Sequence, residues 1–178
     1  MTRTVATLHF LAGRAGAGKT TLARRIASET QAILICEDEW MSRLAVPVES
    51  LHEYVTAAAR IRSVIAPLTA DLLRAGVSVV FDFGGNSVRD RDWVRSVFQQ
   101  ASADHVLHYV RTDDETCRTR VRQRNELKPE GVFFGIVTEA QLDEVNTFFA
   151  PPGDHEGFTI VVHDPSPGPA RGSAFGEP

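Results

Sequence analysis

A short glycine-rich segment near the N-terminus carries the residues with the most distinctive chemistry in this sequence. It is Gly13–Thr20 (GRAGAGKT), which matches the pattern G-x-x-x-x-G-K-T in full. The segment directly follows an apolar run, Val5–Leu11, and opens a stretch in which Leu22 and Ile26 have helical spacing. A strand, a glycine-rich turn and a helix N-terminus in this order are typical of a loop that surrounds phosphate groups. This placement disfavours the alternative, a glycine-rich turn that binds nothing.

The residue types in this segment fit a nucleotide site. Small side chains let successive backbone N–H groups surround the phosphates, and the helix N-terminus adds partial positive charge. Lys19 can reach the β- and γ-phosphates of ATP, and the hydroxyl of Thr20 can coordinate Mg²⁺. We therefore expect ATP and Mg²⁺ as cofactors, with the choice between ATP and GTP left open. The expected nucleotide-binding residues are Gly13, Gly16, Ala17, Gly18, Lys19, Thr20 and Thr21. The segment alone is compatible with hydrolysis, with a binding switch, or with phosphoryl transfer to an acceptor.

Two carboxylates stand where a parallel sheet binds its ligands, beyond the carboxyl ends of predicted strands. The first, Asp82, follows the apolar residues Val79–Phe81. An acid after such a run is typical of a Walker B residue, which holds Mg²⁺ directly or through a water molecule. The alternative is a residue that caps a turn at the end of the strand. We favour Thr20 and Asp82 as the metal-binding pair.

The second carboxylate, Asp38, comes two residues after Cys36, at the end of another apolar run. An acceptor hydroxyl needs a carboxylate that orients it and takes its proton as the phosphoryl group is transferred. Glu37 and Glu39 compete for this role, but alternation along an extended segment directs them away from Asp38. The other alternative is that Asp38 is the N-cap of a short helix that begins near Trp40. We predict that Asp38 handles the acceptor.

Four arginines at alternate positions follow the fourth apolar run: Arg118, Arg120, Arg122 and Arg124. Arg120 and Arg124 are four residues apart and therefore share one face of a helix. Directed into a cleft, this pair can stack on adenine and neutralise charge on the transferring phosphoryl group. Arg118 and Arg122 are predicted to form a solvated basic face. The stretch Asn125–Val137 has no regular period and occupies the place of a lid that closes over a bound nucleotide.

The elements that position these side chains alternate along the chain. Strand-like apolar runs are separated by stretches with helical spacing, which predicts an α/β fold with crossover connections and a parallel sheet covered by helices on both faces. Within the longest predicted helix, Tyr54–Leu72, Pro67 is expected to kink or interrupt the backbone. The five predicted strands are Val5–Leu11, Ala32–Cys36, Val77–Phe83, Val106–Val110 and Phe158–Val162.

Three helix starts carry capping signals. Ser87 is a candidate N-cap for the helix after the third strand. Thr112 with Glu115, and Thr138 with Gln141, match the T-x-x-E/Q pattern of a capping box. We expect these residues to mark the first turns of the last three helices.

Composition restricts the class of protein. A chain of 178 residues with 43% hydrophobic and 24% charged residues is typical of one soluble globular domain. The net charge of −4 and the lack of a block of Lys or Arg disfavour a nucleic acid as the main partner. No apolar run is long enough to span a bilayer, and the N-terminus lacks a signal-peptide pattern. We therefore expect a cytoplasmic monomer or homodimer that does not bind membranes.

Taken together, these residues make the sequence similar to a known group. It resembles the small P-loop kinases of the AAA_33 type, which are related to the polynucleotide 5′-kinase, zeta-toxin and chloramphenicol phosphotransferase families. The resemblance implies a P-loop NTPase three-layer sandwich with a five-stranded parallel sheet in the order 2-3-1-4-5. It extends to about His163 and is carried by Gly13–Thr20, Asp38, Asp82, Asn86, Arg91, Arg120, Arg124 and Asn125.

The resemblance also implies roles. Asp38 becomes the carboxylate that activates the acceptor, Arg124 a lid arginine on the phosphates, and Arg120 a neighbour of the nucleotide; Lys19 completes the predicted catalytic set. We expect ATP-dependent transfer of the γ-phosphoryl group to a hydroxyl of a small molecule, either nucleoside-like or antibiotic-like. The alternatives are a polynucleotide 5′-hydroxyl kinase and a nucleotide-binding switch without an acceptor. The acceptor is left open, because Asp82–Asn86 (DFGGN) departs from the Asp-Ala-Thr/Asn of many relatives.

Two stretches fall outside the alternating pattern. The first is the predicted lid, near residues 125–137. The second is the end of the chain, residues 164–178, which is rich in Pro, Gly and Ser and is expected to be a disordered tail. The predicted organisation is therefore one P-loop kinase domain over residues 1–163, with a short lid, followed by the tail.

Overall fold

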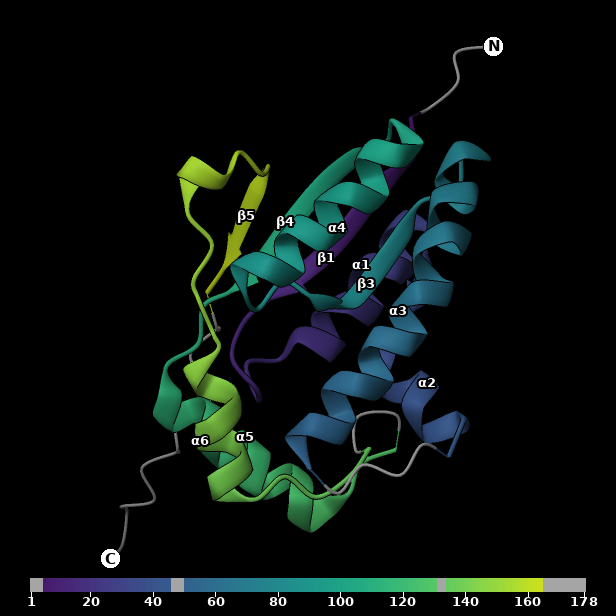
Figure 1. The fold of residues 1–178 in the computed structure, drawn as a ribbon. Coiled ribbons are helices and arrows are strands. Elements are labelled where there is room, and N and C mark those ends of the chain that lie inside the picture. Colours follow the sequence, from purple (N-terminus) through teal and green to yellow (C-terminus); the bar gives the residue numbers. More distant parts are fainter. Residues whose placement is uncertain (1–4, 46–49, 131–133, 165–178) are drawn as a thin grey trace, which may run out of the picture.

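The structure, a computed structural model, describes residues 5–45, 50–130 and 134–164 of the chain. Strands and helices alternate, as the sequence predicts, and Figure 1 shows them as a sheet with helices on both faces. Along the chain the elements are β1 (Thr7–Ala12), α1 (Lys19–Thr30), β2 (Ile33–Ile35), α2 (Glu37–Arg43), α3 (Leu51–Arg74), β3 (Val79–Gly84), α4 (Val88–Ala101), β4 (Asp104–Val110), α5 (Asp114–Leu127), α6 (Glu139–Thr147), the 3-10 turn η1 (Asp154–Glu156) and β5 (Ile160–His163).

The strands form one parallel sheet. Their order is β2-β3-β1-β4-β5, which confirms the predicted order. In the centre, Leu8 of β1 lies opposite Val79 of β3 on one side and His105 of β4 on the other. Because all strands run in one direction, their carboxyl ends and the loops that follow them share one edge of the sheet. This edge receives both the glycine-rich segment after β1 and Asp82 near the end of β3.

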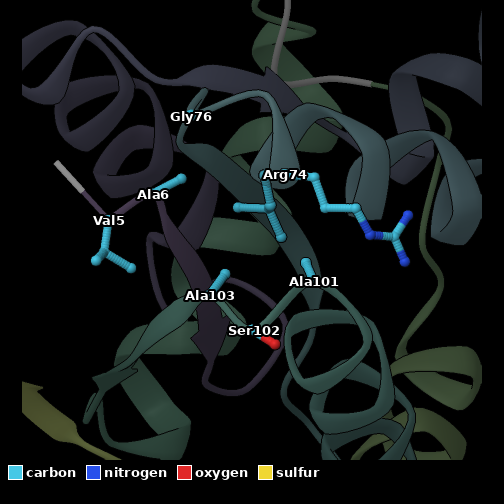
Figure 2. A pocket seen from close by; sticks show the side chains of 8 residues that line it. Val5, Ala6, Arg74, Gly76, Ala101, Ser102 and Ala103 are labelled. Carbon is cyan, nitrogen blue, oxygen red and sulfur yellow. The ribbon is translucent and has the colours of Figure 1, made fainter. Parts of the chain in front are cut away.

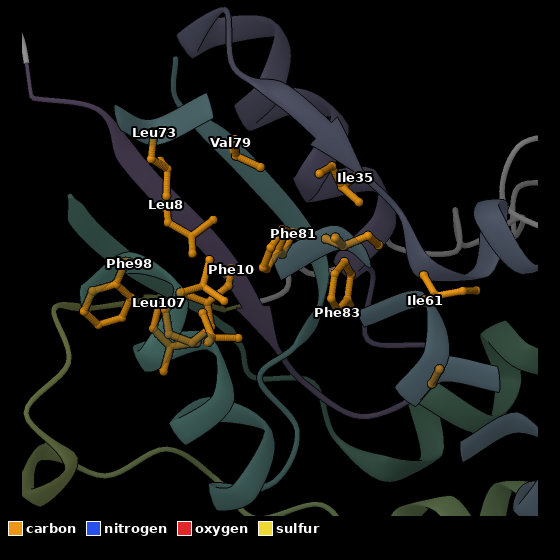
Figure 3. Packing of buried hydrophobic residues seen from close by; sticks show 14 of the residues in the cluster. Leu8, Phe10, Ile35, Ile61, Leu73, Val79, Phe81, Phe83, Phe98 and Leu107 are labelled. Atoms are coloured by element: carbon orange, nitrogen blue, oxygen red, sulfur yellow. The ribbon is translucent and has the colours of Figure 1, made fainter. Parts of the chain in front are cut away.

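Alternation along the strands sends side chains to two separate cores. Leu8 and Phe10 of β1 are fully buried in the larger core, which α3 and α4 cover. Leu11 points to the smaller core, which α1 covers. Figure 3 shows the larger core, in which the rings of Phe81 and Phe83 from β3 stack with centroids 4.5 Å apart. The result is the predicted three-layer arrangement, with helices on both faces of the sheet.

α3 passes through Pro67 without a break, so the expected interruption does not occur. Proline removes one backbone donor and leaves the carbonyl four residues earlier, that of Ser63, without its helical partner. Both residues are exposed, so water can hydrogen-bond to this carbonyl. A capping box between Ser50 and Glu53 fixes the start of the helix, and its buried face is held by the larger core.

Two of the three predicted caps are confirmed. The Ser87 hydroxyl accepts a hydrogen bond from the N–H of Asp90 at 3.1 Å and begins α4. The Thr138 hydroxyl accepts from the N–H of Gln141 at 3.2 Å, and the Gln141 side chain accepts from the N–H of Thr138 at 2.9 Å. These reciprocal bonds form the predicted capping box of α6.

The predicted capping box of Thr112 and Glu115 is wrong. The N-cap of α5 is Asp113, whose carboxylate accepts from the N–H of Thr116 at 2.8 Å. Thr112 is buried, and its hydroxyl donates to the carbonyl of Ala17 in the glycine-rich loop at 3.1 Å. This tertiary contact engages Thr112 elsewhere, and the next residue caps the helix.

The described residues cover the predicted lid and tail in part. α5 continues through Leu127, so the irregular segment begins after this residue rather than at Asn125. The amide of Asn125 spans the base of the segment: Nδ2 donates to the carbonyl of Val137 at 2.7 Å, and Oδ1 accepts from its N–H at 3.2 Å. Residues 131–133 and all of the predicted tail except Asp164 lie outside the described residues. Of the helices described, none has the length and apolar character needed to cross a membrane.

Candidate active site

The glycine-rich segment forms a loop between β1 and α1, at the carboxyl edge of the sheet. Its first residue, Gly13, donates its backbone N–H to Oδ1 of Asn86, in the loop after β3, at 3.0 Å. Gly16 has a φ of +83°, and a Cβ at this position would collide with the backbone carbonyl of Cys117 in α5. Glycine is therefore required here both by the backbone conformation and by the close approach of α5. The loop ends at the N-terminus of α1, where unpaired N–H groups favour an anion.

Lys19 is the first residue of α1, and its ammonium group lies against the loop. Nζ donates to the carbonyls of Gly13 at 2.6 Å and of Arg14 at 2.9 Å. Burial lowers the pKa of Lys19, and the carboxylates of Asp82 and Asp38 oppose this shift. Lys19 is thus a partly buried cation in the electrostatic field of both predicted functional carboxylates.

Thr20 and Asp82, the predicted metal-binding pair, are in contact. The Thr20 side chain hydrogen-bonds to the Asp82 carboxylate, and the Cys36 thiol donates to Oδ2 of the same group at 3.5 Å. Burial raises the pKa of Asp82, while Thr20, Lys19 and Cys36 act to lower it. Hydroxyl and carboxylate oxygens are the hard donors that Mg²⁺ prefers, and a divalent cation would offset the cost of burying this carboxylate. The residues present therefore fit Mg²⁺.

Asp38 lies in the first turn of α2, because that helix begins at Glu37 rather than near Trp40. The N-cap position is occupied by Cys36, so the interpretation of Asp38 as an N-cap is wrong. The carboxylate of Asp38 is exposed and accepts a hydrogen bond from the hydroxyl of Tyr54 at 3.0 Å. It is thus a solvent-accessible acid in the first turn of a helix, oriented by one neighbour.

The two acids beside Asp38 are both engaged in ion pairs. Glu37 is only 2% exposed, and its carboxylate accepts two hydrogen bonds from Arg62, at 2.6 and 3.2 Å. Glu39 accepts two hydrogen bonds from Arg43, at 2.9 and 2.7 Å. The expected alternation of an extended segment does not apply, because the three acids lie on a helix and point in three directions. Glu37 and Glu39 are thus both paired with arginine, whereas Asp38 has no ion-pair partner within the part of the chain that the structure describes.

Arg120 contacts the glycine-rich loop, and Arg124 lies within electrostatic reach of Lys19 and Asp38. Nη1 of Arg120 donates to the carbonyl of Ala17 at 3.0 Å. Nε of Arg124 is buried and has no hydrogen-bond partner among the described residues. Burial lowers the pKa of Arg124, and the charge of Asp38 raises it. A buried guanidinium nitrogen without a partner is suited to an incoming anion such as phosphate.

Arg118 and Arg122 form ion pairs with α6. The side chain of Arg122 is 60% exposed, so the predicted solvated face is confirmed for this residue, but acidic partners neutralise its charge. Arg118 contacts Asp114 at 2.6 Å, Glu139 at 3.1 Å and Asp143 at 2.7 Å. Arg122 contacts Glu139 at 2.7 Å. Figure 1 shows α5 and α6 side by side at the lower end of the molecule. These contacts join the two helices that flank the predicted lid.

A buried arginine joins the loops behind the site. Arg91 of α4 is completely buried, and its Nε and Nη2 donate to the two carboxylate oxygens of Glu156 at 2.6 and 2.8 Å. Its Nη1 donates to the carbonyls of Gly85 and Ala150, both at 2.8 Å. The N–H of Ala150 donates in turn to the carbonyl of Asn86 at 2.9 Å. Because Asn86 also holds the first glycine of the phosphate loop, Arg91 supports that loop indirectly.

Sequence reasoning missed the partners of several buried polar residues. Tyr54 lies in the apolar stripe of α3, which indicates that it faces inward but not that its hydroxyl meets α2. Nothing local marks the pairing of Glu37 with Arg62. The burial of Arg91 had a usable signal, because Val94 lies one helical turn further along the buried face of α4.

One cavity lies far from the residues of the candidate active site. It has a volume of about 480 Å³ and lies near Ala6, Gly76 and Ser102, between the ends of α3 and α4 (Figure 2). Ala6 directly precedes β1, so the cavity lies at the amino edge of the sheet. Ligands of such sheets bind at the opposite, carboxyl edge. The cavity is therefore not the candidate active site.

Comparisons with known proteins agree with this fold. The model of the AAA_33 family, described as an AAA domain, matches residues 8–152. No curated protein matches the sequence.

Solved structures of the same fold cover most of the chain. A protein from Chloroflexus aurantiacus is similar with a TM-score of 0.72 at 16% identity, over 90% of this chain and 89% of that chain. Kti12 from Chaetomium thermophilum, solved with ADP-AlF3, has a TM-score of 0.64 at 14% identity, over 87% and 88%. The APS kinase CysC from Mycobacterium tuberculosis, solved with AMPPNP and APS, has a TM-score of 0.58 at 18% identity, over 90% of both chains. At such identities the likeness establishes the fold.

Proposed function

Because the chain belongs to the AAA_33 family, we propose that it is an ATP- and Mg²⁺-dependent phosphotransferase that moves the γ-phosphoryl group to a hydroxyl of a small molecule. The observation that carries this proposal is the position of Asp38. Its exposed carboxylate lies within electrostatic reach of Lys19 and Arg124, and no cation forms an ion pair with it among the described residues. A switch without an acceptor has no need of such an acid beside its phosphate site, whereas phosphoryl transfer needs a carboxylate that orients the acceptor hydroxyl.

The nucleotide part of the site has a defined set of candidate groups. The backbone of Gly13–Thr20 and the ammonium of Lys19 would bind the phosphates, and Arg124 would contact the transferring group through its unpartnered nitrogen. Thr20 and Asp82 would hold Mg²⁺, which supplies positive charge to the phosphate oxygens. Two similar structures were solved with AMPPNP and with ADP-AlF3, which supports a nucleotide at this loop.

Asp38 would act on the acceptor. Its free carboxylate oxygen accepts the proton of the acceptor hydroxyl while the hydroxyl oxygen attacks the γ-phosphorus and ADP departs. The proton must go to a base that is not already neutralised, and Glu37 and Glu39 are both paired with arginines. Asp38 is therefore the acid of α2 best suited to this step.

The pairing of cations around α2 supports a small acceptor rather than a polynucleotide. Arg62 pairs with Glu37 and Asp90, and Arg43 pairs with Glu39. Binding of a nucleic-acid backbone requires several unpaired Lys or Arg side chains, since its affinity depends on neutralised phosphates. The APS kinase of similar fold was solved with APS, a small molecule.

The test is transfer of label from γ-³²P-ATP with Mg²⁺ into a panel of acceptors. The panel contains nucleosides, nucleotide-sugars, hydroxyl-bearing antibiotics and 5′-hydroxyl oligonucleotides. Asp38→Asn should lower transfer by about 100-fold or more, the usual loss when a general base is removed. It should leave ATP binding intact. Glu39→Gln is the matched control, because it neutralises a neighbouring acid of the same helix and should retain transfer. Lys19→Ala should abolish transfer and weaken ATP binding.

Each other outcome selects a different function. Label found only in free phosphate, at equal rates in the wild type and Asp38→Asn, would contradict the proposal and favour a nucleotide switch. Label found only in oligonucleotides would favour a polynucleotide kinase.

A further inference from the structure

The hydroxyl of Tyr54 lies between two carboxylates of α2. It is 3.0 Å from Oδ1 of Asp38 and 3.3 Å from Oε2 of Glu37. Tyr54 comes from the first turn of α3, four residues after the N-cap Ser50. A single phenol proton therefore faces two acceptors that belong to a different helix.

Of the two carboxylates, Asp38 is the better acceptor for the hydrogen bond that the Tyr54 hydroxyl donates. A hydroxyl has one proton to donate, so it serves one carboxylate at a time. Glu37 already receives two hydrogen bonds from Arg62, whereas Asp38 receives none from any other described residue. Burial, followed by the charges of Asp38 and Glu37, raises the pKa of Tyr54 well above its ordinary value. The phenol therefore remains a donor throughout the pH range in which an enzyme works.

The frame behind this contact is rigid. Arg62 holds Glu37 through Nε at 2.6 Å and holds Asp90 through Nη1, also at 2.6 Å. Its guanidinium lies over the rings of Trp93 at 5.2 Å and Phe83 at 5.6 Å. Both ion pairs are largely shielded from water, so screening weakens them little. The first turn of α2 is thus fixed against α3 and α4, and the Tyr54 hydroxyl meets Asp38 at a defined position.

We propose that Tyr54 is the positioning residue of Asp38, a role that rests on the function proposed above. Its hydrogen bond fixes one carboxylate oxygen, Oδ1, and leaves Oδ2 directed to the acceptor hydroxyl. In the transfer step the acceptor O–H proton passes to Oδ2, the acceptor oxygen bonds to the γ-phosphorus, and the bond from that phosphorus to the β–γ bridging oxygen breaks to release ADP. Tyr54 keeps its own proton throughout and touches neither substrate.

The first experiment compares kinetic constants of the wild type, Tyr54→Phe and a matched control. Tyr54→Phe retains the ring and removes the hydroxyl, and we expect kcat for transfer to fall about 10- to 100-fold, the effect of losing one hydrogen bond to a charged group. The KM for ATP and the affinity for ATP should not change, because Tyr54 does not contact the phosphate loop. Thr56→Val removes another hydroxyl from α3, one that donates to the carbonyl of His52, and should leave kcat unchanged.

A double-mutant cycle with Asp38→Asn separates positioning from general support of the fold. If Tyr54 acts through Asp38, adding Tyr54→Phe to Asp38→Asn should cause no further loss of kcat. A full additional loss in the double variant would overturn the proposal, as would wild-type kcat in Tyr54→Phe. The latter result, together with lost transfer in Asp38→Asn, would leave the proposed function standing. Full transfer by Asp38→Asn would overturn both.

A spectroscopic measurement tests the contact even if Tyr54→Phe does not fold. The chain has two tyrosines, so protein labelled with ¹³Cζ-tyrosine gives two NMR signals, and Tyr109→Phe identifies the one from Tyr54. Asp38→Asn should move the Tyr54 signal and leave that of Tyr109 in place, because a phenol carbon senses the charge of its hydrogen-bond acceptor. An unmoved Tyr54 signal would refute the contact.

Discussion

Replacement of Arg91 by methionine is expected to be the most destabilising change to the loops behind the site. Arg91 is fully buried, and Glu156, its partner, has a side chain only 6% exposed. The two groups share hydrogen bonds of 2.6 and 2.8 Å, and Arg91 also supplies donors to two backbone carbonyls. Arg91→Met keeps much of the apolar stem but removes all four bonds.

The magnitude follows from what the substitution leaves behind. Burial acts to raise the pKa of Glu156, and Arg91 and the N–H of Gly153 hold it below its ordinary value. Without Arg91 a buried carboxylate loses its counter-charge, which costs about 3–5 kcal/mol in proteins. Exchanging both members for apolar residues of similar volume costs much less, because no charge is then left buried. We therefore expect Arg91→Met to lower the free energy of unfolding by about 4 kcal/mol and the double variant Arg91→Met/Glu156→Leu by about half of that or less.

Urea unfolding followed by circular dichroism gives these free energies. Arg89→Met is the matched control, because Arg89 belongs to the same helix and is exposed. Its loss should cost clearly less than that of Arg91. A cost below about 1 kcal/mol for Arg91→Met, the level of a surface ion pair, would refute the reasoning. A double variant less stable than Arg91→Met alone would refute it as well.

Three further predictions test local parts of the fold. Asp113→Ala should cost about 1 kcal/mol in urea unfolding as the loss of an N-cap, whereas Glu115→Ala should cost less than half as much; the reverse order would restore the sequence-based capping box. Burial lowers the pKa of His108 to about 4, so the unfolded chain binds a proton that the folded chain does not as pH falls from about 6.5 to 4. Stability should therefore fall by about 2 kcal/mol between pH 7 and pH 5 relative to His108→Gln, and parallel pH profiles of the two proteins would contradict this. Gly16→Ala should weaken binding of a fluorescent ATP analogue by at least about 10-fold, because its Cβ would meet a backbone carbonyl of α5. Gly76→Ala, also at positive φ but with open space around it, should leave that binding unchanged.

The sequence predicted the elements of the fold well because their signals are local. The G-x-x-x-x-G-K-T pattern, the apolar runs of the strands and the N-caps Ser87 and Thr138 all depend on residues within a few positions of one another. The strand order followed from the resemblance to a known family, and the sheet has that order. Pro67 shows the limit of local rules, since the burial of one face of α3 and an exposed carbonyl allow the helix to continue.

The candidate site was predicted as a set of residues, and the structure shows how they are related. Lys19, Thr20 and Asp82 were expected together from the loop and the strand end, and they lie in contact or in one electrostatic field. Asp38 was predicted to be in an extended segment, yet it lies in a helix turn. Strand alternation therefore does not explain why Asp38, rather than Glu37 or Glu39, is available to an acceptor. Those two acids are set apart by arginine partners, which are not visible in the local pattern.

Sequence alone determined which side chains face inward, because a helical or strand period fixes direction over a few residues. Only the tertiary structure decided which buried polar groups meet. Arg91 finds Glu156 across 65 residues of chain, and Tyr54 finds Asp38 across 16. Such pairs depend on the path of the whole backbone, and each polar group must find a partner once water is excluded. The residues that orient the predicted acid were therefore fixed by the packing of α2, α3 and α4, and not by any pattern within one of these helices.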